Sequence, residues 1–321
     1  MPRNDHRTLT TNDIPPIPPS SDTVFLVNPA SDNGATGKRW PELANRAAHL
    51  GLSGETLFST RPDELIDLAE QAARGGSRLL VAVGGDGTLN EVVNGVLRAG
   101  ADVEVATIPL GTGMDFVRTY GIPTDFDDAV RVAQSGNVRT IDVGRVDYRS
   151  WAGTDETRYF DNVSSAGMSG AVAQRANSMS KALGGRVTFF YALTRVFFQW
   201  ENTEVVVTLD GGERRGRMHD VIVANGIWHG GAMKLAREAK PDDGFFDVVL
   251  IGDITKPDFL LTARKLYSGA YLTHQKVELL RSRVVAVGAP EPLPIELDGE
   301  QVGTTPARWE IVPSALRVRV P

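Results

Sequence analysis

Five consecutive residues carry the clearest chemical signal in the chain: Gly84, Gly85, Asp86, Gly87 and Thr88. The three glycines let the backbone turn tightly and present successive N–H groups to an anion. Thr88 is placed to cap a following helix, whose positive N-terminal end also favours phosphate. Asp86 would repel a phosphate unless a cation or a proton-donating hydroxyl lies between them, and Mg²⁺ is commonly held by one or two carboxylates together with phosphate oxygens. The loop therefore predicts a site for a nucleotide with Mg²⁺, and the alternative is a tight strand-to-helix turn with Asp86 exposed.

Two further loops have the composition of a ligand site. One spans residues 28–38, and the other spans residues 111–115 and includes Gly111, Thr112 and Gly113. Lys38 is a candidate to hold terminal phosphates, with an ordinary solvated lysine as the alternative. Neither glycine loop has the Gly-x-Gly-x-x-Gly spacing of a dinucleotide-binding fold, and residues 34–38 are too short for a P-loop and lack its Ser or Thr. Both of those motifs are therefore excluded.

Short β-branched runs alternate with helical segments from residue 23 to about residue 144. The pattern predicts strands at 24–27, 78–83 and 103–108. It predicts helices near 40–50, 62–75 and 89–97, and a further helix that runs through Phe116 and Val117. Repeats of strand, loop and helix are typical of βαβ units, so we expect an α/β, Rossmann-like domain with a mostly parallel sheet. The three loops follow strand carboxyl ends, where ligands sit in such sheets. They should therefore converge on one site.

After about residue 145 the chain becomes rich in predicted strands. Segments 204–209 and 220–224 indicate a hairpin or near-hairpin. Further strands are predicted at 245–251, 276–280, 283–287 and 293–297, and helices at about 179–200 and 257–272. We therefore expect a β-rich, sandwich-like or open-barrel second domain. The predicted division is a nucleotide-binding domain at 23–144, a substrate domain at 145–305, and a segment at 306–321 that returns to the first domain.

The composition excludes several classes of function. The 321-residue chain has 34 Lys and Arg against 40 Asp and Glu, a net charge of −6, and no cysteine. Disulfides, thiolate nucleophiles and thiolate-bound metals are therefore absent, and an acidic chain is a poor binder of nucleic acid. No apolar run approaches the ~20 residues of a membrane span. Residues 1–22 are Pro-rich and lack the apolar core of a signal peptide, so we expect a disordered tail and a cytoplasmic protein.

An ordered series of motifs resembles the bacterial diacylglycerol kinase/sphingosine kinase family of soluble lipid kinases. In the first domain the series comprises Val27-Asn28-Pro29-Ala30, residues 84–88, 90–95 and 108–116, and Ile141-Asp142-Val143-Gly144. In the second it comprises residues 162–167, 224–226, 230–231, 240–247 and 295–300. The resemblance spans residues 22–321. NAD kinases share the Gly-Gly-Asp-Gly-Thr loop, but the rest of the series is similar to the lipid-kinase branch.

The resemblance implies a fold of the NAD kinase/diacylglycerol kinase type and transfer of the ATP γ-phosphoryl group to the hydroxyl of a diacylglycerol-like or sphingosine-like lipid alcohol. Such a transfer needs positioning and charge neutralisation more than covalent chemistry. The resemblance makes Asp86 and Glu300 catalytic, with Glu300 as the base for the lipid hydroxyl. The remaining matched positions are Asn28, Gly84, Gly85, Gly87, Thr88, Gly111, Thr112 and Gly113 for ATP, and Asn225, Gly230 and Gly231 for the substrate cleft.

Two Mg²⁺ sites are also implied by the resemblance. Asp86, Asp115 and Asp142 would form a carboxylate network that positions the catalytic Mg²⁺ directly or through water. A second, structural Mg²⁺ would use the Asp243 side chain together with backbone carbonyls at Lys240 and Phe245. The expected cofactors are therefore ATP and Mg²⁺.

One residue departs from the family's pattern, because Met114 stands where the family usually has Asn. Met offers only a weak sulfur acceptor, whereas Asn supplies two donors and an acceptor. The change motivates one alternative, a weakly active or non-catalytic nucleotide-binding regulator. The other alternative is a soluble small-molecule kinase of the NAD kinase type, which the shared glycine loop motivates.

The lipid side of the site is less visible in the sequence. Residues 187–200 are dense in aromatic side chains, which fits a helix that lines an acyl-chain cleft or leans on a bilayer, and equally a helix packed on the second domain's sheet. Lys181, Arg186 and Arg195 are candidates to meet anionic headgroups or to form a solvated face. We expect transient, peripheral membrane contact, and the resemblance is compatible with a homodimer. The five histidines are expected to be non-catalytic, and His229 is the most interesting because it precedes Gly230.

Overall fold

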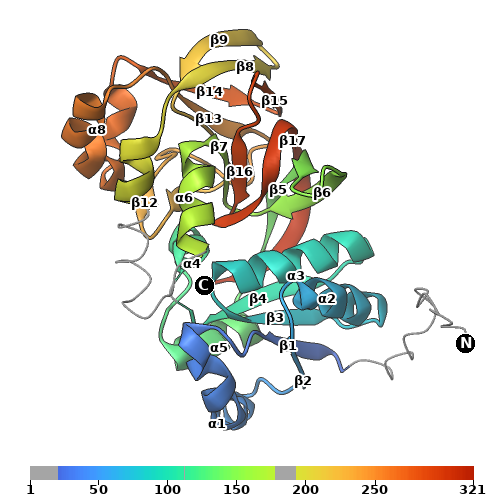
Figure 1. Cartoon of the computed structure of the whole chain (residues 1–321). Helices are drawn as coiled ribbons and strands as arrows, with labels where there is room; N and C mark the ends of the chain where they lie inside the picture. Colours follow the sequence, from blue (N-terminus) through green and yellow to red (C-terminus); the bar gives the residue numbers. More distant parts are fainter. Residues whose placement is uncertain (1–20, 112, 178–192) are drawn as a thin grey trace, which may run out of the picture.

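The computed structural model describes residues 21–111, 113–177 and 193–321. The Pro-rich tail, Thr112, Lys181, Arg186 and most of the helix predicted at 179–200 lie outside the described residues. The described chain consists of an α/β part followed by a β-rich part, and both contribute to one continuous sheet of 15 strands (Figure 1). The predicted fold class, an α/β first domain with a mostly parallel sheet and a β-rich second domain, is confirmed.

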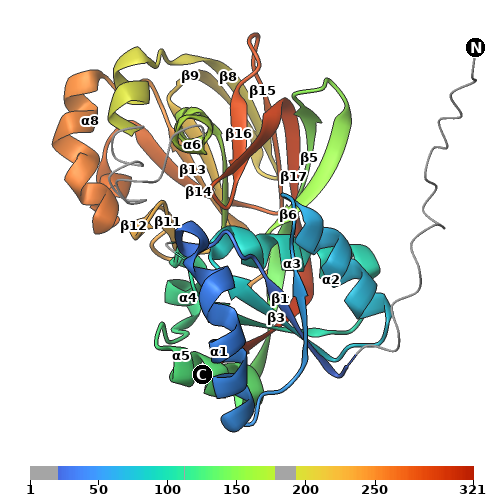
Figure 2. The same cartoon turned by 60° about the horizontal axis from the view of Figure 1, so that its bottom comes forward.

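Four parallel strands form the first part of the sheet, in the order β2, β1, β3, β4. They are β1 (Thr23–Val27), β2 (Glu55–Phe58), β3 (Leu79–Gly84) and β4 (Glu104–Pro109). One face of this sheet is covered by α2 (Glu64–Arg74) and α3 (Asp86–Ala99), and the other by α1 (Ala35–His49) and α5 (Phe126–Ser135) (Figures 1 and 2). A short helix, α4 (Asp115–Tyr120), follows β4.

Alternating side chains of β1 show how both faces are filled. Val24 and Leu26 belong to the apolar cluster beneath α2 and α3, whereas Phe25 and Val27 belong to the cluster beneath α1 and α5. A strand buried on both faces reads as a continuous apolar run, which is why this strand is visible in the sequence. The ring of Phe25 meets that of Trp40 on α1 edge to face, with centroids 5.1 Å apart.

The second part is mainly antiparallel. Its strands are β5 (Asn137–Ser150), β6 (Asp155–Phe160), β7 (Val163–Gly167), β8 (Thr203–Leu209), β9 (Gly212–Met218), β10 (Asp220–Ala224), β11 (Trp228–His229), β12 (Met233–Lys234), β13 (Phe246–Ile251), β14 (Val277–Ser282), β15 (Val284–Gly288), β16 (Pro294–Leu297) and β17 (Glu300–Val320). Helices α6 (Met168–Asn177) and α8 (Lys256–Thr262) lie beside this sheet (Figure 1).

Two long strands join the two parts. Strand β5 runs without a break through residue 145, where the sequence predicts a domain boundary, and it pairs antiparallel with β17 over most of its length. Strand β17 begins beside β16 in the second part, and near its end Arg317 and Val318 pair in parallel with β4 of the first part. The last residues of the chain therefore complete the first part of the sheet.

The hairpin predicted from segments 204–209 and 220–224 is wrong. Strand β8 pairs instead with β9, and β10 lies between β7 and β13 elsewhere in the sheet. Strand β9 carries Arg214, Arg215 and Arg217 and is largely exposed, so it lacks the alternating apolar pattern that reveals a strand in a sequence.

The helix predicted at 257–272 is also broken, since α8 ends at Thr262 and two 3₁₀ segments follow, Ala263–Tyr267 and Ala270–Thr273. Within the described ranges, no helix combines the length and the apolar character needed to cross a bilayer.

Candidate active site

The three polar loops converge as predicted. The backbone N–H of Leu110 donates to the carbonyl of Gly84 over 2.9 Å, and the hydroxyl of Thr36 donates to the carbonyl of Leu110 over 2.9 Å. A Cβ atom on Gly111 would lie only 2.5 Å from the Cα of Gly85, so the two glycines permit direct backbone contact. These loops form one wall of a cleft of about 1430 Å³, whose other wall comes from the second part of the chain.

Most of the residues predicted to contact nucleotide line this cleft: Asn28, Gly85, Gly87, Thr88, Gly111 and Gly113. Thr112 lies outside the described residues. Gly84 does not line the cleft, because it ends the buried strand β3 and leaves no room for a side chain beside Thr88. The expectation that Thr88 caps helix α3 is wrong, since α3 begins two residues earlier at Asp86 and the Thr88 hydroxyl instead lies 3.5 Å from that of Ser31.

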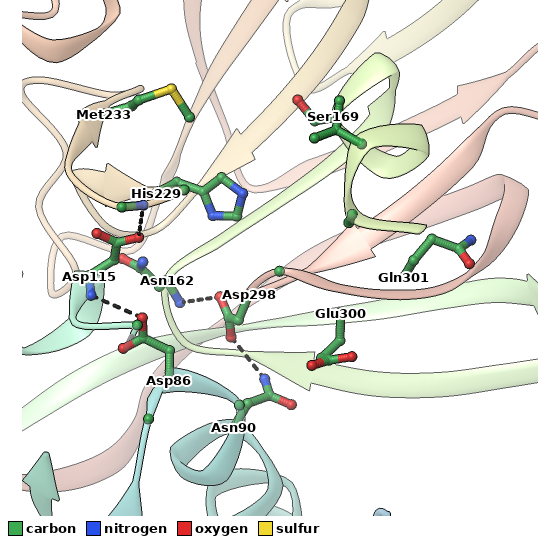
Figure 3. Close-up of a pocket in the computed structure, with 18 of the residues that line it drawn as sticks. Asp86, Asn90, Asp115, Asn162, Ser169, His229, Met233, Asp298, Glu300 and Gln301 are labelled. Carbon is green, nitrogen blue, oxygen red and sulfur yellow. Dashed lines mark hydrogen bonds between the residues drawn. The ribbon is translucent and has the colours of Figure 1, made fainter. Parts of the chain in front are cut away.

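Asp86 lies at the first position of α3 and faces the 111–115 loop (Figure 3). Its carboxylate accepts hydrogen bonds from the backbone N–H groups of Asp115 over 3.0 Å and Phe116 over 3.4 Å, which are the first residues of α4. Burial raises the pKa of Asp86 to about 6, and the nearby charges of Asp115 and Asp298 raise it further while the backbone donors oppose the rise. A carboxylate in such surroundings favours a cation beside it.

Asp115 connects the two parts of the chain across the cleft. Its carboxylate accepts from the backbone N–H groups of Gly231 and Ala232, each over 2.9 Å, and pairs with Arg118 over 2.7 Å. The turn that it holds contains Gly230 and Gly231 at φ values of +62° and +84°, a conformation that favours glycine. Both glycines line the cleft as predicted. Asp115 therefore positions a turn of the second part.

The Asp298-Gly299 pair forms a two-residue turn between β16 and β17, with φ values of +49° and +90°. The Asp298 carboxylate accepts four hydrogen bonds, from the Asn90 side chain over 2.8 Å and from the backbone N–H groups of residues 161, 162 and 163 (Figure 3). Burial raises its pKa to about 6. The turn projects Glu300 into the cleft, where its Oε1 lies 3.6 Å from the position that a Cβ on Gly87 would take.

His229 also lines the cleft, beside the turn that Asp115 holds (Figure 3). Its Nε2 lies 3.5 Å from Oε1 of Glu296, a buried carboxylate that also accepts from Ser165 over 3.0 Å. Burial lowers the pKa of His229, but the negative charges around it, with Glu296 foremost, outweigh burial and raise the pKa overall. The sequence singled out this histidine only by its neighbour Gly230.

Three predicted site residues lie away from the cleft. Lys38 is exposed on α1, because the cleft-facing part of the first loop ends before it. Asp142 is buried with its two oxygens bonded to the backbone N–H groups of Gly244 over 2.7 Å and Ser314 over 2.8 Å. Asn225 donates to the carbonyls of Asp142 and Asp161 and does not line the cleft. Asp142 and Asn225 therefore hold the joint between the two parts.

Of the three carboxylates that the resemblance implies for the catalytic Mg²⁺, Asp86 and Asp115 line the cleft and Asp142 does not. Among the residues that the structure describes, no group of three or more His, Asp or Glu side chains is arranged to hold a metal ion. Oδ1 of Asp115 accepts two hydrogen bonds, whereas Oδ2 accepts one, so both oxygens of Asp86 and Oδ2 of Asp115 are candidate ligands for the catalytic Mg²⁺. These three oxygens each keep a lone pair beyond the N–H bond they accept, and oxygen donors of this kind suit Mg²⁺.

The predicted structural Mg²⁺ site has a different partner. The Asp243 carboxylate pairs with the guanidinium of Arg281 and accepts a hydrogen bond from the backbone N–H of Phe245 over 3.2 Å. Lys240 is exposed nearby. Arg281 therefore supplies a positive charge to Asp243 from within the chain, and the structural Mg²⁺ site remains a prediction.

Beyond the acidic end, the cleft extends into an apolar arm within the second part. The walls of this arm include Val172, Ile222, Met233, Leu235, Ile251 and Phe259. Ile222 and Ile251 come from neighbouring strands β10 and β13, and Val172 comes from α6. The arm therefore lies on one face of the second sheet, between α6 and the segment around α8.

Some cleft residues were missed by sequence reasoning. Arg118 and Arg158 line the cleft as cations, paired with Asp115 and Asp63 respectively. Arg118 follows Asp115 by three residues, so a helix predicted over the whole of 115–120 would have brought the pair together. Asn90 follows Asp86 by four residues on α3, and that spacing places both on one face of the helix. Arg158 gives no comparable signal, because it reaches the cleft only through the pairing of β6 with β5.

Comparison with known proteins matches two families along the chain. Residues 22–146 match the family described as the diacylglycerol kinase catalytic domain, and residues 162–320 match the YegS C-terminal NAD kinase beta sandwich-like domain. A diacylglycerol kinase of Bacillus subtilis is 27% identical over 286 residues, which cover 89% of this chain and 91% of that protein. A diacylglycerol kinase of Staphylococcus carnosus is 25% identical over 299 residues, covering 92% and 94% respectively.

Solved structures support the fold. A putative diacylglycerol kinase from Bacillus anthracis superposes with a TM-score of 0.74 at 20% identity, covering 93% of this chain and 97% of that one. Yeast NADH kinase, solved with NADH, superposes with a TM-score of 0.52 at 12% identity, covering 93% and 82%.

Proposed function

Because the chain belongs to the diacylglycerol kinase family, with its catalytic domain followed by a beta sandwich-like domain, we propose that it transfers the γ-phosphoryl group of ATP to the hydroxyl of a lipid alcohol. The observation that carries the lipid assignment is the shape of the cleft. One end is built from glycine loops and carboxylates, and the other is the apolar arm lined by Val172, Ile222 and Ile251. A soluble acceptor such as NAD has no use for such an arm, whereas an acyl chain gains about 0.8 kcal/mol for each CH₂ it buries.

The glycine-loop end suits the triphosphate. Gly85, Gly87, Gly111 and Gly113 leave backbone close to the cleft, and the N-terminus of α3 points its unpaired N–H groups there. Asn28 lines the same end and holds its own loop by accepting from the N–H of Ala30 over 3.0 Å. We assign these groups to ATP.

We assign the proton transfer to Glu300. As the bond between the lipid oxygen and the γ-phosphorus forms, the bond between that phosphorus and the bridging β–γ oxygen breaks, and the hydroxyl proton passes to the Glu300 carboxylate. Asp298 fixes the turn that carries Glu300 through its four hydrogen bonds. Asp86 would hold Mg²⁺ together with phosphate oxygens, and the ion when bound would neutralise charge on the phosphates.

The apolar arm reaches a rim that suits a bilayer. Phe259 and Leu266 line the arm, while Leu260 and Leu261 on the same helical segment are 62% and 78% exposed. Phe198 and Tyr267 are also large, apolar and exposed, and Lys256 of α8 donates to the Phe198 carbonyl over 2.6 Å, which places Phe198 beside α8. We propose that this rim contacts the membrane from which the lipid is drawn.

The dependence of turnover on acyl-chain length tests this assignment. With diacylglycerols that differ only in chain length, presented in the same detergent micelles, kcat/KM should rise roughly threefold to fourfold per buried methylene until the arm is filled. A kcat/KM that does not change with chain length would show that the apolar arm does not bind the acyl chain. It would favour the alternative, a soluble small-molecule kinase. The variant Met114→Asn tests the other alternative, a weakly active or non-catalytic nucleotide-binding regulator. If the wild-type protein shows no kinase activity and this variant does, the protein is a kinase that Met114 weakens.

A further inference from the structure

Two polar side chains interrupt the apolar arm. Asp220, the first residue of β10, is flanked in the sheet by Gly167 of β7 and Ile251 of β13, so it lies in the floor of the arm in the same row as Ile251. His219 precedes it and also lines the cleft. Apart from Ser169 and Asn202, which bond to them, the neighbouring side chains include the apolar Ile251 and the aromatic Phe259, whose ring centroid lies 6.0 Å from that of His219.

One oxygen of Asp220 has no hydrogen-bond partner in the described part of the chain. Its Oδ2 accepts from the backbone N–H of Ser169 over 3.1 Å and from the Ser169 hydroxyl. Its Oδ1 is buried without a partner among the described residues, in a residue that is only 3% exposed. Burial raises the pKa of Asp220 to about 7, as expected for a carboxylate whose charge is incompletely satisfied.

His219 presents a second acceptor. Asn202 uses its Nδ2 to donate to Asp253 over 2.8 Å and to the Ile254 carbonyl over 2.9 Å, so its Oδ1 faces His219 and Nδ1 of His219 must carry the proton. Burial lowers the pKa of His219 to about 4, so the ring is neutral near pH 7. Its Nε2 is then a lone-pair acceptor that has no partner among the described residues, although the residue is 5% exposed.

Buried acceptors without donors are costly, and each one calls for an explanation, such as a bound ligand or water. Sheet register gives their distance from the reacting end. Asp298 binds the N–H of Val163 at one end of β7, and Asp220 lies opposite Gly167 at the other end. Four residues of strand separate Val163 from Gly167, which is about 13 Å.

We propose that His219 and Asp220 form a polar subsite that binds a hydrogen-bond donor, a hydroxyl or an ammonium group, carried by the lipid about 13 Å along the cleft from the Asp298-Gly299 turn that presents Glu300. The inference rests on the proposed function and deepens it. An unsubstituted acyl chain has no donor for these acceptors, so the subsite favours a lipid with a polar group partway along its length.

The test compares three diacylglycerols that share a headgroup and chain length: one unsubstituted, one with a mid-chain hydroxyl and one with a mid-chain amine. The wild-type protein should use at least one substituted lipid with a kcat/KM about tenfold or more above that of the unsubstituted lipid. Response to the amine alone identifies a cationic ligand, and response to both identifies a hydroxyl-type donor.

The substitution Asp220→Asn replaces one hydrogen-bond acceptor of the subsite by a donor and leaves the side-chain volume nearly unchanged. The new Oδ1 keeps the bonds from Ser169, while the new Nδ2 places a donor where the ligand's donor belongs. The preference for the amine-bearing lipid should fall about tenfold or more, because an ammonium group can only donate and then faces the Nδ2 donor in a buried site. Asp247→Asn is the matched control, since Asp247 is a buried carboxyl on the neighbouring strand β13 that does not line the cleft. His219→Phe is the second variant, and it keeps an aromatic ring beside Phe259 while removing the acceptor.

Equilibrium binding of the same lipids without ATP separates the two claims. If no lipid is phosphorylated but the substituted lipid still binds more tightly and loses that advantage in Asp220→Asn, the subsite stands and the kinase assignment falls. If all three lipids are phosphorylated equally well, or the preference survives in both Asp220→Asn and His219→Phe, the subsite is overturned while the kinase assignment stands.

Discussion

The carboxylate of Asp86 accepts a hydrogen bond from the backbone N–H of Asp115 over 3.0 Å, although the two residues lie 29 positions apart. The bond joins the start of α3 to the start of α4. The Asp115 carboxylate then accepts a hydrogen bond from the backbone N–H of Gly231 in the second part. Hydrogen bonds therefore connect the glycine loop to the opposite wall of the cleft. A change in charge at Asp86 should therefore be felt in catalysis and in stability together.

Asp86→Asn should lose turnover, and its stability relative to the wild type should rise between pH 4 and pH 8. Turnover should fall by about 100-fold or more, because the charge that neutralises the reacting centre is removed. The native pKa of about 6 exceeds the ordinary value of 3.8, so ionisation costs the wild type stability as pH rises through 6, a cost that is absent below pH 3.8. The melting temperature of the variant minus that of the wild type should therefore be a few degrees higher at pH 7–8 than at pH 4. The new Nδ2 faces a backbone N–H group and lowers the stability of the variant at both pH values. Unchanged turnover would remove Asp86 from the mechanism.

Glu300→Gln should depress kcat while leaving ATP affinity nearly intact. A general base typically contributes 10²- to 10⁴-fold, and the amide cannot take the proton. Steady-state kinetics should show this loss in kcat with the KM for ATP within about threefold of the wild type. The matched control is Glu310→Gln, on the same strand β17 but paired with Arg308 away from the cleft. A parallel loss of ATP affinity would make Glu300 a nucleotide contact instead.

Gly111→Ala should weaken nucleotide binding. Its new Cβ would lie 2.5 Å from the Cα and 2.6 Å from the N of Gly85, and backbone atoms cannot rotate away. We expect a loss of about 1–3 kcal/mol in unfolding free energy, as in overpacked cores, and a clear rise in the Kd for ATP measured by calorimetry. Gly211→Ala is the control, because its Cβ would have no neighbour within 4 Å. Equal effects of the two changes would count against the loop contact.

The double variant Leu260→Ser/Leu261→Ser should lose activity only on membranes. These side chains are exposed on α8, so their replacement should leave the fold unchanged. Turnover of lipid in vesicles should fall several-fold, while turnover of the same lipid dissolved in detergent should be unaffected. Loss in both assays would indicate damage to the arm, and loss in neither would show that the rim does not meet the bilayer.

The first part of the fold was readable from the sequence because its strands are buried on both faces. Strands β1 and β3 are continuous apolar runs bounded by glycine or polar loops, and the loops that follow them mark the site directly. Strand β2 escaped prediction because its Glu55-Thr56-Leu57-Phe58 segment is only half-buried at the sheet edge. Strand β9 escaped for a similar reason, since its arginines face solvent.

Site residues could be predicted from the sequence where they belong to a local motif. They could not be predicted where their position depends on how the strands pair in the sheet. Asp86, Gly230 and Glu300 line the cleft as expected. Asp142 belongs to an equally conspicuous motif, yet strand pairing turns its carboxylate toward Gly244 and Ser314. His219 and Asp220 line the cleft only because β10 lies between β7 and β13. Their partners in the sheet are distant in the sequence, since Asp220 pairs with Gly167 and with Ile251, and no local pattern encodes that pairing.

A competition assay is the most direct test that the acceptor is a lipid hydroxyl. Long-chain diacylglycerol in detergent micelles and NAD are offered together with radiolabelled ATP and Mg²⁺, and the labelled products are separated by chromatography, with Asp86→Asn as the blank. If the protein is a lipid kinase, the radiolabel should appear in the phosphorylated lipid and not in the NAD fraction. Label in the NAD product with an unlabelled lipid fraction would contradict it.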